Sequence, residues 1–236
     1  MATSMALGLW LAYRDARRRG LNPESLLKAS ELALLGGLIG ARLYYVIFNL
    51  DYYGLYPAKI FAVWEGGLAI HGGVIGGLLV GGGYAWQQSL PLATYLDIVA
   101  PSMSLGQCIG RWGNFFNEEA FGTPTDVPWK LFISPAQRPL AFAHAEYFHP
   151  AFLYESLWNL GVFVVLYFFL RDRFAKAPGA LFLVYLGLYS LGRFMTEGIR
   201  TDPLMFGTIR VAQVASLVGI SLAVIGVPLL LRRARA

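Results

Sequence analysis

Apolar residues occur along this chain in long, nearly uninterrupted runs, separated by stretches that hold most of the charge. A helix needs about 20 mainly apolar residues to cross a bilayer, and the runs that reach or approach this length cover residues 2–13, 26–48, 67–86, 92–110, 152–170, 179–197 and 209–231. The first run is too short to span as it stands. Because no run alternates like a strand, the pattern predicts an all-α, polytopic membrane bundle of about seven helices rather than a barrel.

Composition supports a membrane protein. Of the 236 residues, 56% are hydrophobic and only 14% are charged, whereas soluble domains average about 25% charged residues. The single cysteine, Cys108, excludes an internal disulfide or a cysteine metal cage, and three scattered histidines do not form a ligand set. We therefore expect a single integral membrane domain over residues 1–236, with no metal and no cofactor.

Basic residues indicate the orientation. They cluster after the first run, between the fifth and sixth runs, and at the C-terminus, at Arg14, Arg17, Arg18, Arg19, Lys28, Arg171, Arg173, Lys176, Arg232, Arg233 and Arg235. The positive-inside rule puts these clusters on the cytoplasmic side, so seven crossings place the N-terminus outside and the C-terminus in the cytoplasm. The net charge of +5 then indicates anionic lipid head groups as partners, not nucleic acid.

Two segments outside the long runs carry further expectations. The N-terminal apolar run precedes its basic cluster, the reverse of a secretory signal, so no cleavable signal peptide is expected. The shortness of that run suggests that the sequence begins late. The connection 111–151 is rich in aromatic residues and prolines, and it is expected to form a small external cap between the fourth and fifth helices rather than a flexible linker.

The stretch 109–122, IGRWGNFFNEEAFG, concentrates polar groups where an apolar run ends. Arg111 can fork onto a phosphate or carboxylate. Asn114 and Asn117 share a face if the backbone is helical, and Gly113 and Gly122 allow close approach of the backbone or a positive φ. The alternative interpretation is a capped helix end followed by a solvated loop.

In the predicted topology, several helices bring polar and ionisable side chains to the outer-leaflet side, namely Arg42, His71, Arg111, Tyr154, Glu155, Tyr189, Arg193 and Glu197. Such residues are costly at membrane depth and usually face the interior or a wet cavity, although each alone can be a structural ion pair or a snorkelling side chain. Gly72 and Gly73 follow His71 directly, and bare backbone there would let a substrate approach the imidazole. The other glycines of this helix, and Gly36 and Gly40, are spaced for helix packing.

Three hypotheses follow from these side chains. Arginines match a phosphate, and a phosphate at this depth most simply belongs to a lipid, which favours an enzyme that transfers a group from a phospholipid. A membrane transporter or channel for an anionic solute is the alternative from another class. It should show two related halves with broken helices, and no such repeat occurs in the sequence. A scaffold with structural ion pairs is the third hypothesis.

Four motifs carry a resemblance to a known family. LAIHGGVIGG (68–77), GRWGNFFNEEAFG (110–122), HPAFLYE (149–155) and GRFMTEGIR (192–200) resemble, in order and spacing, the signatures of prolipoprotein diacylglyceryl transferase. The resemblance implies transfer of the diacylglyceryl group of phosphatidylglycerol to the lipobox cysteine of prolipoproteins, with formation of a thioether and release of glycerol 1-phosphate. It also implies the bacterial plasma membrane, with the active site toward the outer leaflet and membrane lipid around it.

The same resemblance assigns functional positions to His71, Arg111, Asn114, Glu119, Gly122, Tyr189, Arg193 and Glu197. We expect His71, Arg111, Arg193 and Tyr189 to be catalytic, and expect substrate contacts from Arg111, Asn114, Asn117, Glu119, Gly122, Glu197, Gly72 and Gly73. His71 either acts as the base for the incoming cysteine or only orients the lipid. Glu119 and Glu197 are expected to orient the arginines, with Glu197 able to bridge Arg193 and Arg200.

Two features depart from the family pattern. The family has a longer N-terminus with a tyrosine-glycine pair, which cannot be assigned in this chain. The position of Glu118 is often a glycine in the family.

Overall fold

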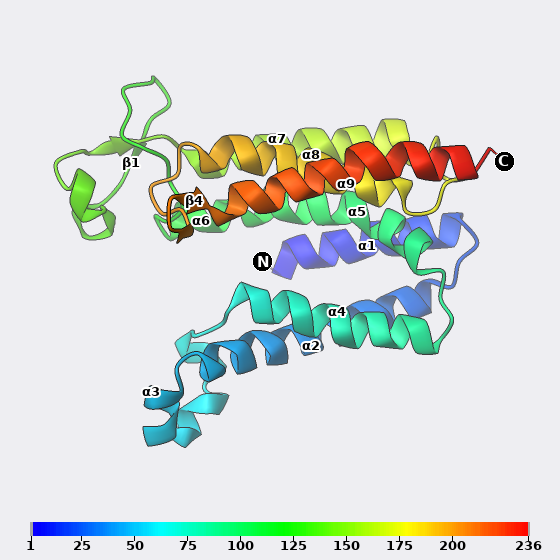
Figure 1. Ribbon diagram of the computed structural model, residues 1–236, viewed down its shortest axis with the longest axis horizontal. Coiled ribbons are helices and arrows are strands. Elements are labelled where there is room, and N and C mark those ends of the chain that lie inside the picture. Colours follow the sequence, from blue (N-terminus) through cyan, green and yellow to red (C-terminus); the bar gives the residue numbers. More distant parts are fainter. Residues whose placement is uncertain (1, 236) are drawn as a thin grey trace. The chain divides into compact units, whose positions relative to one another are not determined.

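The computed structural model describes residues 2–235, and helices dominate it (Figure 1). The α-helices are α1 (Ala2–Arg18), α2 (Pro23–Ile47), α3 (Leu50–Leu55), α4 (Ile70–Gln87), α5 (Leu92–Gly110), α6 (Trp112–Phe116), α7 (Ala151–Val164), α8 (Ala180–Glu197) and α9 (Val211–Arg233). A π-helical stretch, Val165–Leu170, continues α7. The strands are β1 (Leu131–Phe132) with β2 (Tyr147–Phe148), and β3 (Met205–Phe206) with β4 (Ile209–Arg210); both pairs are antiparallel.

Each apolar run contains a helix, so the all-α prediction is confirmed. The first helix was predicted too short: α1 continues through the basic cluster to Arg18. Arg and Ala are good helix formers, and an ion pair between Asp15 and Arg19, 3.1 Å apart, joins positions four residues apart. An apolar pattern alone could not show this continuation.

Three helices are long and apolar enough to cross a membrane: Pro23–Ile47, Ala151–Leu170 and Val211–Arg233. The other predicted crossings do not meet the same standard within residues 2–235. Their lower hydropathy has a visible cause, since α4 contains many glycines and α8 carries Arg193 and Glu197. The count of seven crossings therefore stays a prediction.

Contacts divide the chain into two compact units, one of residues Tyr13–Tyr95 and one of the residues up to Ala12 together with those from Leu96 onward. In the first unit α2 and α4 pack through their glycines. A Cβ on Gly40 would lie 2.3 Å from the carbonyl oxygen of Gly72, and one on Gly76 would lie 2.2 Å from that of Gly36. The expectation that Gly36 and Gly40 serve helix packing is confirmed, because the two backbones approach too closely for any larger residue.

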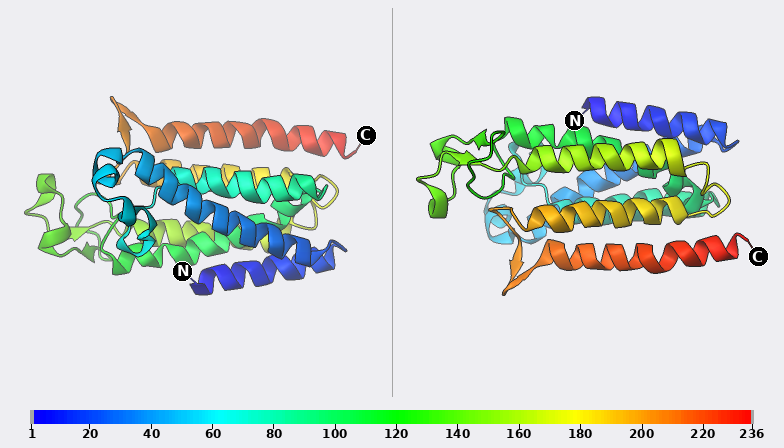
Figure 2. Two further views of the ribbon diagram at one scale, coloured as in Figure 1. Left: turned by 90° about the horizontal axis from the view of Figure 1, so that it is seen from below. Right: turned by 90° about the horizontal axis from the view of Figure 1, so that it is seen from above.

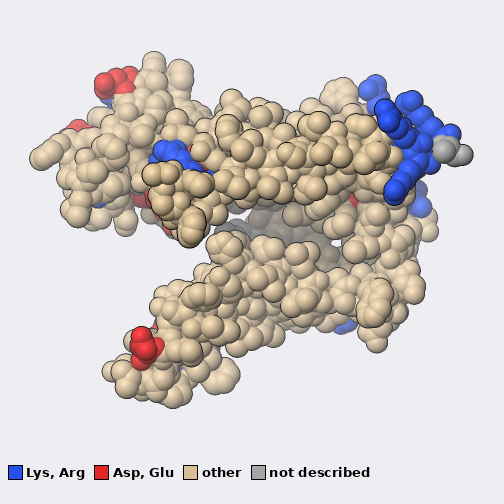
Figure 3. Space-filling model, viewed as in Figure 1, with Lys and Arg blue, Asp and Glu red and all other residues tan. Residues whose placement is uncertain are grey.

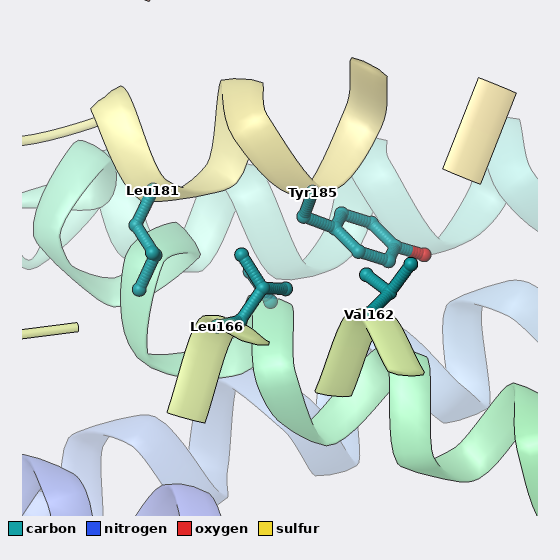
Figure 4. Close-up of a cluster of buried hydrophobic side chains, with 5 residues drawn as sticks. Val162, Leu166, Leu181 and Tyr185 are labelled. Atoms are coloured by element: carbon teal, nitrogen blue, oxygen red, sulfur yellow. The ribbon is translucent and has the colours of Figure 1, made fainter. Parts of the chain in front are cut away.

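In the second unit α5, α7, α8 and α9 run lengthwise beside one another (Figures 1 and 2). The core between α7, its π-helical extension and α8 is formed by the fully or nearly buried Val162, Leu166, Leu181 and Tyr185 (Figure 4), with Ala100 of α5. At one end of this core Asp97 caps α8. Its carboxylate, only 1% exposed, accepts the N–H groups of Gly179 and Phe182 at 2.8 Å each.

The connection between α5 and α7, residues 111–151, is hereafter the cap segment. It folds over its own small core of Phe121, Ile133 and Phe148, with Ile133 and Phe148 fully buried. β1 and β2 close a hairpin around this core. Some of the aromatic residues that argued against a flexible linker thus pack in this core.

Basic side chains gather at the end of this unit where α9 ends, away from the cap segment (Figure 3). Arg232 and Arg233 lie in the last turn of α9. The expected orientation rests on this separation between the basic residues and the polar motifs.

Candidate active site

A buried carboxylate on α7 gathers three arginines. The side chain of Glu155 is 6% exposed. Its Oε1 lies 3.0 Å from Nη1 of Arg193 and 3.8 Å from Nη1 of Arg200, while its Oε2 pairs with Nη2 of Arg111. The end of α5, α8 and the segment after α8 each supply one cation, so segments far apart in sequence meet at one carboxylate. We call these four residues the arginine cluster.

A second buried carboxylate supports the cluster from α8. Oε2 of Glu197, whose side chain is 1% exposed, lies 2.6 Å from Nη2 of Arg193, one helical turn away. The carbonyl oxygen of Glu197 accepts a hydrogen bond from Nη1 of Arg210, which ties β4 to the end of α8. Arg193 is therefore held between two carboxylates.

The expected bridge from Glu197 to both Arg193 and Arg200 is wrong for the second arginine. Arg200 instead pairs bidentately with Asp202, at 3.0 Å and 2.8 Å, besides its contact with Glu155. The helix ends at Glu197, and Arg200 lies in an extended segment that pairs with Gly122. The helical spacing that would bring Glu197 and Arg200 together ends before Arg200.

The arrangement leaves the arginines more open than the carboxylates. The side chains of Arg111 and Arg193 are each 21% exposed, against 6% for Glu155 and 1% for Glu197. Buried charges need partners, and here the arginines supply them while the side chains of Arg111 and Arg193 stay partly exposed.

Asn114 and Asn117 converge on Glu119. Their amide nitrogens donate to Oε1 of Glu119 at 2.9 Å and 3.2 Å. The expectation that Glu119 orients an arginine is therefore not met, since the carboxylate binds the two amides. The asparagines do lie together as their spacing predicted, in and just after the short helix α6.

The backbone conformation at Glu118 explains why the family often has a glycine at this position. Its φ is +50°, a left-handed conformation that glycine adopts at no steric cost. Its carboxylate accepts the N–H of Ser134 at 2.9 Å. The side chain of Ser134, together with this backbone N–H, lowers the pKa of Glu118. The glutamate thus links the motif to the hairpin of the cap segment.

Gly122 lies where the cap segment meets the end of α8. Its N–H donates to the carbonyl of His149 at 2.8 Å, and a Cβ there would lie 2.7 Å from Cβ of His149 and 3.2 Å from the carbonyl oxygen of Ile199. The sequence-based expectation of close backbone approach is confirmed for Gly122. At Gly113 a Cβ would meet open space.

Tyr189 lies one turn before Arg193 on α8. It lines a cavity of about 10 Å³ together with Glu155 and Arg193, and its ring stacks on Tyr185 with centroids 6.1 Å apart. The sequence-based expectation that Tyr189 belongs near Arg193 agrees with this placement.

His71 belongs to the other unit and is described by itself. It is exposed in the first turn of α4, with its ring centroid 6.0 Å from that of Tyr44. Gly72 is not an open approach to the imidazole, because a Cβ there would lie 2.2 Å from the carbonyl oxygen of Gly40. The reason given for Gly72 as a substrate contact is therefore wrong. At Gly73 a Cβ would make only ordinary contact, 3.6 Å from Cβ of Ala41, so its role stays a prediction. The common depth of His71 and the arginines stays a prediction.

Arg42 has a structural task. Its guanidinium donates to five carbonyl oxygens, at distances that include 2.6 Å to Gly66 and 2.8 Å to Ile60. A guanidinium has five N–H donors, so this network matches its full capacity. Arg42 thus organises the segment before α4 and is a poor candidate for holding a phosphate.

Glu155 is the residue that sequence reasoning undervalued. From the sequence alone, a structural ion pair and a functional role explained Glu155 equally well, because the partners of Glu155 are remote in sequence. The usable signal was its place at the end of HPAFLYE, as the single charged residue of a mainly apolar helix.

Comparisons with known proteins agree with the motifs. The sequence profile of the family "Prolipoprotein diacylglyceryl transferase" matches residues 1–229. A phosphatidylglycerol–prolipoprotein diacylglyceryl transferase of Thermosynechococcus vestitus is 48% identical over 94% of this chain and 83% of its own length. Proteins of the same name from Trichormus variabilis and Prochlorococcus marinus are 48% and 43% identical, over 100% and 96% of this chain and 85% of their own lengths. These matches support a transferase and give no support to the alternative of an anion transporter. The chain belongs to the prolipoprotein diacylglyceryl transferase family.

Proposed function

We propose that this protein transfers the diacylglyceryl group of phosphatidylglycerol to the cysteine of a prolipoprotein lipobox. The names of its relatives include phosphatidylglycerol, prolipoprotein and diacylglyceryl transfer, and so support this reaction. The observation that carries the proposal in this chain is the convergence of Arg111 and Arg193 on Glu155, with both arginine side chains partly exposed.

The reaction makes a clear demand on the site. The cysteine sulfur forms a bond to the glyceryl carbon, and the bond from that carbon to the phosphate ester oxygen breaks. The electron pair leaves with the phosphate, which departs as glycerol 1-phosphate. The thiol proton passes to a base or to the departing phosphate, so negative charge grows on phosphate oxygens in the transition state.

Arg111 and Arg193 stabilise that charge. Preorganised cations in a water-poor site act most strongly where charge develops, and planar guanidinium groups suit phosphate oxygens. Glu155 and Glu197 hold these cations in position from behind. Glu119 holds the amides of Asn114 and Asn117. When they leave this carboxylate, the two amides can donate to phosphate or glycerol oxygens.

His71 acts on the substrate thiol as general base. The thiolate is the reactive form of cysteine, and nearby positive charge favours it. Tyr189, which lines a cavity with Arg193, belongs to the lipid side of the site. Gly122 serves by packing, since its missing side chain lets the cap segment approach the end of α8.

The membrane arrangement is part of the proposal. Seven crossings of the bacterial plasma membrane, with the N-terminus outside and the C-terminus in the cytoplasm, place the arginine cluster and the cap segment toward the outer leaflet. The basic end of α9 supports this orientation.

One experiment tests the activity directly. The purified protein is reconstituted in nanodiscs that contain phosphatidylglycerol and is incubated with a lipobox peptide. The peptide should gain the mass of one diacylglyceryl group on its cysteine, and a cysteine-to-serine peptide should gain none. No mass gain with phosphatidylglycerol, in protein that is folded, would overturn the proposal.

A further inference from the structure

An apolar groove runs beside the arginine cluster between α7 and α8. Its volume is about 270 Å³, and it is lined by Tyr154, Trp158, Gly192, Met195, Thr196 and Ile199. Almost all of its lining surface is apolar, although Glu155 of α7 and Arg193 and Glu197 of α8 directly follow lining residues in the sequence. The groove and the cluster thus lie on adjoining faces of one helix pair.

Trp158 and Gly192 are common to the groove and to the surroundings of the arginine cluster. Both line the groove, and both also line the small cavity that contains Glu155 and Arg193. Trp158 Nε1 donates to the carbonyl of Leu188 at 2.8 Å, which fixes the indole across the gap. A Cβ on Gly192 would lie 2.3 Å from the indole ring, so any larger residue at this position would displace the indole.

The outer end of the groove is tied to the cap segment. The hydroxyl of Tyr154 accepts a hydrogen bond from Nε1 of Trp129 at 2.8 Å and lies 3.0 Å from Nδ1 of His149. Along α7 the groove runs from Tyr154 to Trp158, and along α8 and beyond from Ile199 back to Gly192. It therefore starts at the end of the helix pair that contacts the cap segment and extends along Ala151–Leu170, a segment long and apolar enough to cross a membrane.

We infer that this groove holds one acyl chain of the phospholipid whose phosphate the arginine cluster binds. The inference deepens the proposed function and rests on it. An apolar groove that shares Trp158 and Gly192 with the cavity of Glu155 and Arg193 has the polarity of a lipid, with the head group at the arginines and the chain along the groove. Chain burial there would add binding energy for the lipid.

Kinetics with a filled groove tests the inference. Met195→Trp places a large ring at the groove, and Leu157→Trp makes the same kind of change at an exposed position of α7 that is not among the lining residues. With long-chain phosphatidylglycerol, Met195→Trp should raise KM about tenfold and leave kcat within about twofold, because uniform binding is lost. The effect should shrink with a short-chain lipid. Equal KM values in the wild type, Met195→Trp and Leu157→Trp would overturn the inference.

Photolabelling decides the question without turnover. Phosphatidylglycerol with a diazirine on one acyl chain should label residues 154–158 and 192–199, and unlabelled phosphatidylglycerol should compete far better than phosphatidylcholine. Equal labelling of the groove by a phosphatidylcholine probe would mean ordinary bilayer contact and overturn the inference. Labelling of the groove by a diazirine lipobox peptide instead would assign it to the protein substrate and also overturn the inference. Absence of transfer in the wild type with specific lipid labelling intact would refute the proposed function and not the groove.

Discussion

The carboxylate of Glu155 on α7 lies 3.0 Å from the guanidinium of Arg193 on α8, and its other oxygen pairs with Arg111. One buried anion therefore sets the separation of the two cations that we assign to the phosphate. A phosphate-binding pair of arginines would otherwise repel each other in a medium of low dielectric constant. The shared carboxylate offsets that repulsion, and both arginine side chains stay partly exposed.

Glu155→Gln should damage both stability and activity. The amide keeps the shape but leaves buried cations without their anion, which costs on the order of 3 kcal/mol when one partner of a buried pair is removed. We expect a lower unfolding temperature in detergent and transfer reduced about a hundredfold. The control is Glu31→Gln, which removes an exposed ion pair with Lys28 and should change stability by less than about 1 kcal/mol. Equal effects of the two substitutions would contradict the shared-anion argument.

Arg111→Lys and Arg193→Lys should each lower kcat/KM for phosphatidylglycerol by roughly a hundredfold, because an ammonium cannot reproduce the planar fork. The measurement is the initial rate of lipobox peptide modification at several lipid concentrations. Arg138→Lys is the matched control, since Arg138 donates to a carbonyl inside the cap segment. Full activity of Arg111→Lys would remove the bidentate role assigned to this residue.

His71→Gln should reduce transfer by about a hundredfold and abolish the acidic limb of the pH–rate profile, because glutamine keeps a hydrogen bond but cannot take a proton. The dependence of kcat/KM on pH provides the measurement. The exposed His144→Gln in the cap segment serves as control. A slower variant with an unchanged profile would assign His71 to lipid orientation instead of base catalysis.

Two glycines of one motif should respond differently to alanine. Gly122→Ala introduces a Cβ 2.7 Å from His149, and overpacking of this kind costs about 1–3 kcal/mol. Gly113→Ala meets open space in a helical segment and should be neutral or slightly stabilising. Thermal unfolding and transfer rates of both variants test this contrast. A harmless Gly122→Ala would show that the contact between the cap segment and the end of α8 tolerates separation.

Replacement of residues 125–146 by a short glycine-serine linker should separate lipid binding from protein modification. The deletion removes β1 and Ile133 from the core of the cap segment and breaks the bond from Trp129 to Tyr154. We expect the shortened protein to insert and bind phosphatidylglycerol but no longer to modify a prolipoprotein. Binding is measured by lipid co-purification and modification by mass spectrometry. Modification at the parent rate would exclude a role for the cap segment in presenting the substrate.

The sequence by itself determined the helical architecture, because apolar runs of helical length have no other way to bury their backbone in a bilayer. It also determined the family, since its motifs are local and specific, and it predicted a role for Arg111 and Arg193. Tertiary structure alone decided that Glu155 joins the arginines, that Glu119 binds asparagines, and that Arg200 turns to Asp202. It likewise showed that the guanidinium of Arg42 donates to carbonyl oxygens and that Gly72 packs against Gly40. These outcomes depend on which remote segments meet and on where a helix ends. Helical spacing predicts neighbours only within one helix, whereas ion pairs form between whatever charges packing brings within a few ångströms.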